Sequence, residues 1–539
     1  MPIKNEFKLA LSQLQSILFL YQTGSVDNKI SLLKLMSKMK LNNDNLLQYH
    51  ECLLFMSSYA ESSKLLQLTQ SELKRLAKYL KKLPANQQAL FNDLGLPYTN
   101  MITRFSCDML YEMLQQYKLK IEIDSFEETG ESLNTALNIT LPDVLKQETT
   151  AGLDNIELLN LLGVKPKERL AFLLNEFNKL AYQPLLKDYL WEAIKIYLNI
   201  SSNEINYSRS FNKLKMNNYY FQNELLKKFD HVALLNAELP VPAKLRDSDR
   251  VEVIAVIRKS LLLSMRETDT ATYMDESSLL LFHLERGVSI ALYGLMPNRQ
   301  LAYQSYIGYT AFKNGFPVAY GGSWVFGHSA MFGLNILETF RGGESGFIMC
   351  QLLRTYIQYF KLNYIEVENY QFGKDNPDGI KSGAFWFYYR YGFRPIDKTL
   401  NKLAEKEFDK IKKVKNYRSC EKTLVALSES NIAINFSTVL PIKKEVIFAS
   451  VLKMIANDFG GNNLEAAKIA IEEFKEKLQI KTTFTNHEYK VLQEVAFWAK
   501  AFNINDTERL KLLLNMIKMK GRDAIAYNEL IKAFTANLA

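Results

Sequence analysis

Four consecutive strand-like segments in the middle of the chain are the feature that most constrains its fold. They run from Ser289 to Phe340 and read SIALYGL, SYIGYTAFK, FPVAYGGSWVF and SAMFGLNILETF. They are rich in the apolar, aromatic and β-branched residues that favour strands. Only Asn314 and Gly315 separate the second segment from the third, and this dipeptide favours a two-residue hairpin turn. The block therefore predicts a run of antiparallel strands.

The residues after this block alternate between helix-like and strand-like patterns. A glycine turn, RGGESG at 341–346, precedes the apolar helical pattern FIMCQLLRTYIQYFK, and the strand-like NYIEVENYQF follows. A second helical pattern, AFWFYYRYGF at 384–393, comes next, and NIAINF at 431–436 is expected to add a last strand to the same sheet. This order predicts an α+β fold with a mixed sheet and a ligand site at the strand-to-helix turn.

Helical patterns fill the sequence on either side of the strands. Thr69 and Glu72 have the spacing of a capping box, and Pro184 opens a further apolar helix at a first-turn position. An acidic, turn-rich stretch predicts a loop or subdomain boundary near residues 124–150. Near the other end of the chain, Asn505 and Glu508 form a second capping-box pattern. Both flanking regions are predicted to be all-helical.

A chain of 539 residues exceeds what one hydrophobic core usually organises. The changes of pattern predict three parts: an N-terminal helical region at 1–230, a sheet domain at 231–438 and a C-terminal helical region at 439–539. With 47% hydrophobic and 23% charged residues, the composition is that of a chain folded almost throughout.

Composition argues against several classes of protein. The four cysteines are far apart, and neither they nor the five histidines show metal-ligand spacing, so we expect no disulfide framework and no metal site. Residues 314–337 lack Asp, Glu, Lys and Arg, but Gly, Pro, Asn and Ser interrupt them, so we expect strands and no membrane span. The first residues lack the pattern of a signal peptide, so a cytoplasmic protein is expected.

The net charge of +9 arises from 67 basic and 58 acidic residues spread along the chain. The strongest basic run, KIKKVKNYR at 410–418, follows the acidic EKEFD and is interpreted as a solvated helix face. A nucleic-acid partner is compatible with this charge but is not the favoured interpretation.

The glycine turn has two interpretations on its residues alone. Glycines and a serine at the start of a helix leave the first backbone N–H groups without intrahelical partners, and such a turn can bind a phosphate or a pyrophosphate. Alternatively, the glycines only let the strand and the helix pack closely. Both interpretations are equally compatible with FRGGESGFIM.

The order of elements and two motifs resemble the GNAT superfamily of N-acetyltransferases. In that family the glycine turn R/Q-x-x-G-x-G/A binds the pyrophosphate of acetyl-coenzyme A through backbone amides, and a later helix, A-x-x-F-Y-x-x-x-G-F, packs beside the thioester. The second motif is matched at all five places, by Ala384, Phe387, Tyr388, Gly392 and Phe393. One helix and one strand separate the two motifs, which also fits the family.

The first motif departs from the family pattern at one place. Arg341 and Gly346 match, but Glu344 stands where the middle glycine is expected. Either this side chain points outward while the backbone binds coenzyme A, or its carboxylate caps the helix N–H groups and fills the site itself. A second departure is Lys381, at a place where the family often has asparagine.

The resemblance implies a GNAT-like mixed sheet with helices on both faces, and an N-acyltransferase activity. Such an enzyme transfers an acyl group, most simply acetyl, from acetyl-coenzyme A or another acyl-coenzyme A to an amine, without a metal. Tyr388 stands at the place that supplies a proton to the departing thiolate. Glu338 is the candidate general base, with Glu366 and Glu368 as rivals. The residues implied in coenzyme A binding are Arg341, Gly342, Gly343, Ser345, Gly346 and Phe347, with the backbone of Leu337 and Phe340.

Two other functions remain open. The same fold could use aminoacyl-tRNA or another carrier as donor, or the chain could be a non-catalytic helical scaffold or binding protein whose sheet domain is structural. The acceptor could be a small amine, an amino acid, a peptide N-terminus or a protein lysine, and we expect the helical regions to select it or to bind a protein partner. Within the aromatic helix, Phe385, Phe387 and Phe393 are expected in the core.

Overall fold

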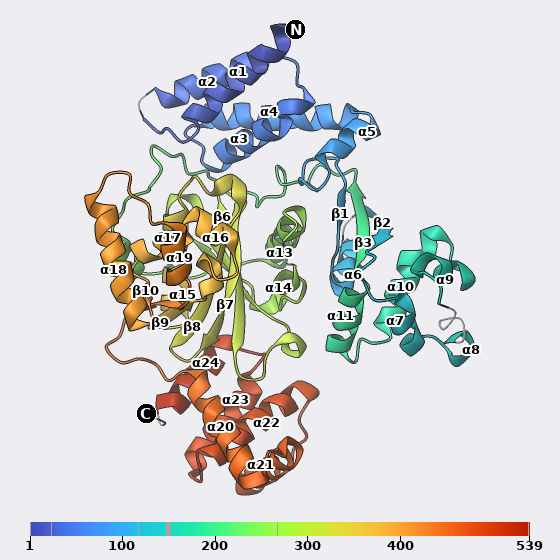
Figure 1. The fold of residues 1–539 in the computed structure, drawn as a ribbon, viewed down its shortest axis with the longest axis vertical. Coiled ribbons are helices and arrows are strands. Elements are labelled where there is room, and N and C mark those ends of the chain that lie inside the picture. Colours follow the sequence, from blue (N-terminus) through green and yellow to red (C-terminus); the bar gives the residue numbers. More distant parts are fainter. Residues whose placement is uncertain are drawn as a thin grey trace. The chain divides into compact units, whose positions relative to one another are not determined.

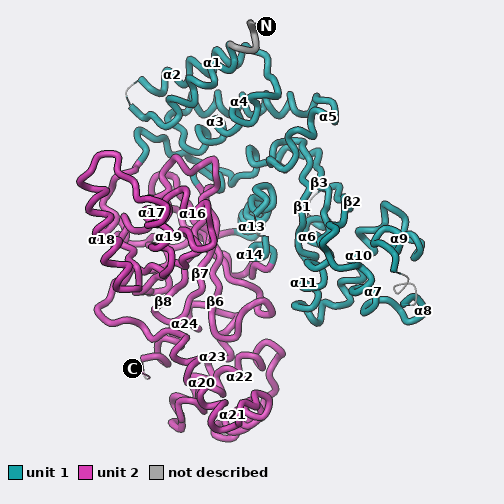
Figure 2. The backbone as a smooth tube through the Cα atoms, in the orientation of Figure 1, with its two compact units in different colours: residues 1–225, 246–272, 313–317 teal, residues 226–245, 273–312, 318–539 magenta. Residues whose placement is uncertain are grey.

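The computed structural model describes residues 2–22, 24–116, 118–146, 152–266, 268–536 and 538. It contains helices and strands, drawn in Figure 1, as the predicted α+β class requires. The chain forms two compact units (Figure 2). Unit 1 comprises residues 1–225, 246–272 and 313–317, and unit 2 comprises residues 226–245, 273–312 and 318–539. Residues 246–272 thus cluster with the N-terminal part of the chain and not with the sheet domain predicted at 231–438.

Unit 1 begins with helices that pack on one another: α1 Pro2–Ile17, α2 Ser25–Met36, α3 Leu46–Ser58 and α4 Ser63–Lys82, followed by the short α5 Ala85–Gln88. The predicted capping box of Thr69 and Glu72 is wrong because α4 begins earlier. Ser62 caps this helix by accepting a hydrogen bond from the Leu65 N–H at 3.2 Å. Thr69 and Glu72 lie buried inside α4, where Glu72 pairs with Arg75.

A three-stranded antiparallel sheet corrects the prediction that the first 230 residues are all-helical. Its strand order is β1 Met101–Thr103, β3 Ile196–Ser202 and β2 Leu119–Phe126. The stretch near 124–150 was predicted as a loop or subdomain boundary. It contains the end of β2, a loop at 127–132 and the helices α7 Leu133–Thr140 and α8 Asp143–Lys146, and its residues 147–150 lie outside the described residues. Ile196, Leu198 and Ile200 of β3 are buried at every second position, the period of a strand with one face in a core.

Six helices accompany this sheet, and all of them except the short α8 contribute residues to a hydrophobic core with it. Helix α11 begins at Pro184, as predicted. The six are α6 Cys107–Gln116, α7 Leu133–Thr140, α8 Asp143–Lys146, α9 Asn155–Leu161, α10 Arg169–Asn178 and α11 Pro184–Ala193. Unit 1 also holds α13 Asp247–Leu263 and α14 Asp269–Thr272.

The tip of the predicted Asn314-Gly315 hairpin belongs to unit 1. Asn314 and Gly315 have φ angles of +47° and +83°, as the favoured two-residue turn requires. The Asn314 side-chain amide donates to the carbonyls of Ser58 and Tyr220 at 2.8 and 2.9 Å, and the Gly315 carbonyl accepts from the Leu214 N–H at 2.9 Å. The turn is therefore tied to residues far from it in the sequence.

Replacing Gly315 with alanine is expected to destabilise unit 1 by about 2 to 3 kcal/mol in urea unfolding. The left-handed backbone disfavours any side chain, and a Cβ at this position would lie 2.7 Å from the Leu214 carbonyl oxygen. Gly163→Ala is the matched control, since its φ of +74° is similar but its Cβ would meet nothing within 4 Å. Equal losses of unfolding free energy in the two variants would contradict a role for the close approach of Gly315 to the Leu214 carbonyl.

Unit 2 is built on an eight-stranded mixed sheet with the order β10-β11-β9-β8-β7-β6-β5-β4. The four predicted central strands are present as β5 to β8, and NIAINF supplies β11 of the same sheet, as predicted; β4 was not predicted. The bounds are β4 Leu280–His283, β5 Val288–Gly294, β6 Ser305–Lys313, β7 Phe316–Phe326, β8 Ser329–Ile336, β9 Tyr364–Val367, β10 Arg394–Pro395 and β11 Ile432–Asn435.

Strands β8 and β9 are parallel neighbours but pair over only three positions, Ser329 with Tyr364, Ala330 with Ile365 and Met331 with Glu366. Beyond Met331, β8 continues to Ile336, whereas β9 ends at Val367. Among the residues that the structure describes, the far half of β8 therefore has no partner strand on the β9 side.

Six helices lie between the strands of unit 2 or precede them. Helix α15 makes the crossover from β8 to β9, and α18 and α19 lie between β10 and β11 in the sequence. The helices are α12 His231–Asn236, α15 Ser345–Tyr359, α16 Pro377–Ser382, α17 Ala384–Arg390, α18 Lys398–Lys413 and α19 Glu421–Leu427.

The C-terminal region is helical, as predicted, and clusters with unit 2. Its helices are α20 Lys444–Phe459, α21 Asn463–Lys477, α22 Asn486–Ala501, α23 Thr507–Met519 and α24 Ala524–Ala536, which enclose a core that includes Phe326 of β7. The predicted capping box of Asn505 and Glu508 is wrong by one residue, because Asp506 caps α23 by accepting from the Arg509 N–H at 2.9 Å.

Lys520, at the end of α23, is 2% exposed. Its ammonium donates to the Gln304 carbonyl and to the Ser305 hydroxyl, and it lies 4.6 Å from the centroid of the Tyr527 ring. Burial lowers the pKa of this lysine from 10.5 to about 7.

Lys520→Met is expected to abolish a pH dependence of the free energy of unfolding. Between about pH 7 and pH 10 the unfolded chain binds a proton at Lys520 that the folded chain has lost, so stability rises with pH across this window. Unfolding of unit 2, followed by tryptophan fluorescence at several pH values, measures the slope. Lys518→Met, at an exposed lysine of the same helix, should keep it; the same slope in Lys520→Met would contradict the assignment.

Within the described ranges, no helix combines the length and the apolar character needed to cross a membrane.

Candidate functional site

The start of α15 presents three free backbone N–H groups. Strand β8 leads through the single turn Glu338–Phe340 and two glycines into this helix, and the first helical bond runs from the Ile348 N–H to the Glu344 carbonyl at 2.9 Å. The N–H groups of Ser345, Gly346 and Phe347 have no acceptor among the residues that the structure describes. A fifteen-residue helix with its N-terminus in this state can bind an anion.

Glu344 adopts neither of the two arrangements considered from the sequence. Its carboxylate is 1% exposed and turns into the protein, where Oε1 accepts from Arg286 Nε at 3.0 Å, from Arg286 Nη2 at 2.6 Å and from the Leu226 N–H at 2.9 Å. It does not cap α15. The carboxylate thus leaves the helix N–H groups unoccupied, and Arg286 offsets its charge.

Glu344→Ala is expected to lower the free energy of unfolding by about 3 kcal/mol, because it leaves the Arg286 guanidinium buried without this partner. The double variant Arg286→Gly with Glu344→Ala should recover most of that loss, since it removes both charges and the left-handed φ of +59° at Arg286.

Lys511→Ala breaks an exposed ion pair with Glu508 and serves as the control, with a loss below about 1 kcal/mol. Urea unfolding of unit 2 measures all three variants. A loss in Glu344→Ala as small as that of the control would contradict a structural role for the buried pair.

The unpaired half of β8 carries polar contacts from side chains. The Leu334 N–H, which points toward the β9 side, donates to the Gln371 side-chain oxygen at 3.3 Å, and the Gly333 carbonyl accepts from the Tyr309 hydroxyl at 2.9 Å. Gln371 belongs to the single turn Asn369–Phe372 that follows β9. A side-chain amide therefore occupies a backbone position that another strand would otherwise pair.

Tyr388 lies on α17 and is 3% exposed, with the rings of Phe372, Phe387 and Phe393 around it at centroid distances of 5.4 to 6.3 Å. Burial raises the pKa of its hydroxyl well above the usual range, so the hydroxyl stays protonated at neutral pH. Burial, and then the neighbouring hydroxyls of Tyr356 and Tyr388, also raise the pKa of Tyr309. Tyr388 is thus close to the tyrosine that binds Gly333 on β8.

The two motif regions meet at Gly346. A Cβ at this position would lie 1.8 Å from the hydroxyl oxygen of Tyr391, the residue that ends α17. Any side chain at position 346 would therefore clash with Tyr391. Phe385 and Phe393 are in the core as expected, but Phe387 is only half-buried, because it lies on the Ala384 and Tyr391 face of α17.

The remaining predicted site residues lie along the turn before α15. The side chain of Glu338 is exposed and has no partner among the described residues. Arg341 is exposed, and its Nε donates to the Ile336 carbonyl at 3.3 Å. The N–H groups of Leu337 and Phe340 are used inside the protein, since they donate to the carbonyls of Val318 and Leu337, each at 2.9 Å.

The rival carboxylates differ in their surroundings. Glu366 on β9 binds the Lys443 ammonium at 2.8 Å and the Asn431 amide at 2.7 Å. Glu368, just beyond the strand, is exposed. A base must be free to accept a proton, so the geometry favours Glu338 and Glu368 over Glu366.

Several residues of this site were missed in the sequence. Tyr391 could have been found, since it lies seven positions after Ala384 and therefore on the same helix face. Arg286 and Gln371 carry no local signal, because only the fold brings them to Glu344 and Leu334.

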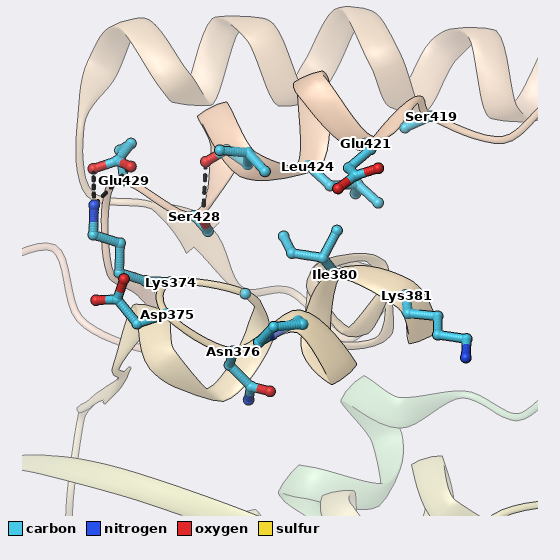
Figure 3. Close-up of a pocket in the computed structure, with 13 residues that line it drawn as sticks. Lys374, Asp375, Asn376, Ile380, Lys381, Ser419, Glu421, Leu424, Ser428 and Glu429 are labelled. Carbon is cyan, nitrogen blue, oxygen red and sulfur yellow. Dashed lines mark hydrogen bonds and ion pairs between the residues drawn. The ribbon is translucent and has the colours of Figure 1, made fainter.

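A groove of about 680 Å³ lies between α16, α19 and the loop at 373–376 (Figure 3), and no predicted site residue lines it. Ile380 and Leu424 contribute apolar surface from opposite sides, and the ion pair of Lys374 with Glu429, 2.7 Å long, lies at one end. The charges around it are mixed in sign, so the groove favours no single class of charged ligand.

A second cluster with catalytic residue types lies in unit 1. The Ser210 hydroxyl is 2.6 Å from His50 Nε2, and Glu51 is 3.0 Å from His50 Nδ1. His50 and Ser210 are 0% and 2% exposed, and Arg209 binds the Glu51 carboxylate at 2.6 Å. The groups of this cluster bind one another and Arg209, so we interpret the cluster as polar support inside the core of unit 1.

No family model, no curated protein and no solved structure matches this chain. Any function has to be argued from the residues and the geometry described above.

Proposed function

We propose that unit 2 is an N-acyltransferase of the GNAT type that transfers an acyl group, most simply acetyl, from coenzyme A to an amine. The observation that carries the proposal is the separation of β8 from β9 next to the free N–H groups of α15. The order of antiparallel strands, glycine turn, helix, strand, helix and strand supports it, because the same order underlies the resemblance drawn from the sequence.

The donor would bind along α15 and β8. Its pyrophosphate accepts from the N–H groups of Ser345, Gly346 and Phe347, with the exposed Arg341 at the same turn. The buried pair of Glu344 and Arg286 reduces the repulsion that a free carboxylate would exert there. The acyl-bearing arm contains amide groups, and one of these can replace Gln371 at the Leu334 N–H.

The transfer would need one base and one acid. The amine nitrogen attacks the thioester carbonyl, forming a carbon–nitrogen bond as the carbon–sulfur bond breaks. Glu338 takes the proton that the amine loses, directly or through water, and Tyr388 donates its hydroxyl proton to the departing thiolate. Tyr388 holds this proton at neutral pH, as any tyrosine does, so its hydroxyl can hydrogen-bond the sulfur and release the proton as negative charge develops there.

Tyr388→Phe is expected to lower kcat by about 100-fold or more, because the phenyl ring cannot donate a proton. Its affinity for coenzyme A should stay within about twofold of the wild-type value. Release of the coenzyme A thiol from acetyl-coenzyme A in the presence of a panel of amines gives the rate, and calorimetry gives the affinity. Tyr389→Phe, at the neighbouring buried tyrosine of α17, is the control and should keep the wild-type rate.

The proposal fails if calorimetry detects no binding of coenzyme A or acetyl-coenzyme A at millimolar concentration. Binding of tRNA that weakens as salt rises, without any binding of coenzyme A, would favour an aminoacyl-tRNA donor on the same fold. If the protein binds neither coenzyme A nor tRNA but co-purifies with a partner protein, the result would favour a scaffold in which the sheet domain is structural.

A further inference from the structure

Residues 226–231, the segment that leads into α12 and ends at its first residue, His231, contact the start of α15. The Leu226 N–H donates to the Glu344 carboxylate at 2.9 Å. The Phe229 ring packs edge-on against Phe347 at 5.7 Å and stacks on Tyr391 at 5.8 Å. His231 adds an edge contact with Tyr391 at 5.7 Å. An aromatic side chain thus lies against a residue whose N–H is free and against the tyrosine that ends α17.

The chain on the far side of this segment is held firmly. Helix α12 packs on α15, where Gln358 donates to the carbonyls of Leu235 and Ala237 and accepts from the Leu239 N–H at 2.8 Å. Arg354 also donates to the Ala237 carbonyl, at 2.9 Å. Helix α12 and the residues just after it therefore have several polar anchors along α15, whereas the segment before α12 contacts the start of α15 through the Leu226 hydrogen bond to Glu344 and through ring contacts.

A pivot lies between the two parts. Asp230 caps α12 by accepting from the N–H groups of Val232 and Ala233, both at 3.0 Å, and the helix begins at the next residue. Phe229 stands just outside the cap. Rotation about the residues before Asp230 would lift the Phe229 ring off Phe347 without unfolding α12.

The covered arrangement leaves polar groups unsatisfied. The N–H groups of Ser345, Gly346 and Phe347 lack acceptors among the described residues, and the Phe229 ring packs against the side chain of Phe347 in the same helical turn. Replacing the ring by a phosphate group would give these donors charged acceptors, which is favourable at a helix N-terminus.

We propose that residues 226–231 form a strap that closes the donor site, and that coenzyme A binds only after displacing it. This inference rests on the function proposed above. It also gives Glu344 a role, since the residue that stands where the family pattern has glycine accepts the first N–H of the strap. The departure from the motif and the strap are parts of one autoinhibitory device.

Phe229→Ala in the full chain is expected to bind coenzyme A about tenfold more tightly than the wild type in calorimetry. If the strap closes the site in nine-tenths of the molecules, the apparent Kd is about tenfold above the intrinsic value, and removing the ring restores the open state. Lys228→Ala is the matched control, because this exposed neighbour lies in the same segment, and its Kd should equal that of the wild type.

Hydrogen exchange on the wild type tests the strap without a variant. Saturating coenzyme A should speed amide exchange in residues 226–231 and leave that of residues 232–236, the rest of α12, unchanged. The strap is overturned if the wild type binds coenzyme A, Phe229→Ala binds it no more tightly, and exchange at 226–231 is not faster. This outcome leaves the acyltransferase proposal intact. If folded wild type and folded Phe229→Ala both fail to bind coenzyme A, the proposed function falls and the strap with it. If Phe229→Ala does not fold, the exchange result decides.

Discussion

The short parallel pairing between β8 and β9 is the constraint on which the rest of unit 2 depends. Parallel neighbours cannot be joined by a tight turn, so the chain must cross over, and α15 makes that crossing. Its start therefore lies directly after the end of β8, close to the part of that strand that β9 leaves unpaired. A helix N-terminus and an open strand edge are brought together by the topology alone, before any particular side chain is considered.

Two ion pairs fix α15 against the turn between β4 and β5. The adjacent residues Glu285 and Arg286 in that turn pair with Arg354 and Glu344 of the crossover segment. In one pair the turn supplies the negative charge of Glu285 and the helix supplies Arg354. In the other pair the turn supplies the positive charge of Arg286, and its partner is Glu344, just before the helix. Because Glu344 and Arg354 are ten positions apart, the two pairs hold the crossover segment to this turn at two separate points.

The sequence predicted the parts of this molecule that depend on neighbours along the chain. Strands β6 and β7 have the bounds expected from their patterns, because Asn314 and Gly315 define the turn between them. The sheet of unit 1 was missed although LKIEIDSF alternates as a strand should, because its partner β3 lies far along the chain, with Ile121 opposite Ile200. The surroundings of Glu344 could not be predicted either, since its partners Arg286 and Leu226 lie 58 and 118 residues away.

Glycine at position 346 lets α15 and the end of α17 approach each other closely. Tyr391 fills the volume that any other residue would claim at this position, so the end of α17 rests directly on the first turn of α15. The N–H groups that would hold the phosphates and the helix that carries the proposed proton donor are therefore in direct contact, through the Tyr391 side chain and the Gly346 backbone, before a ligand arrives. The residue type at position 346 is therefore restricted by the close approach of α15 and α17 as well as by any need to bind phosphate.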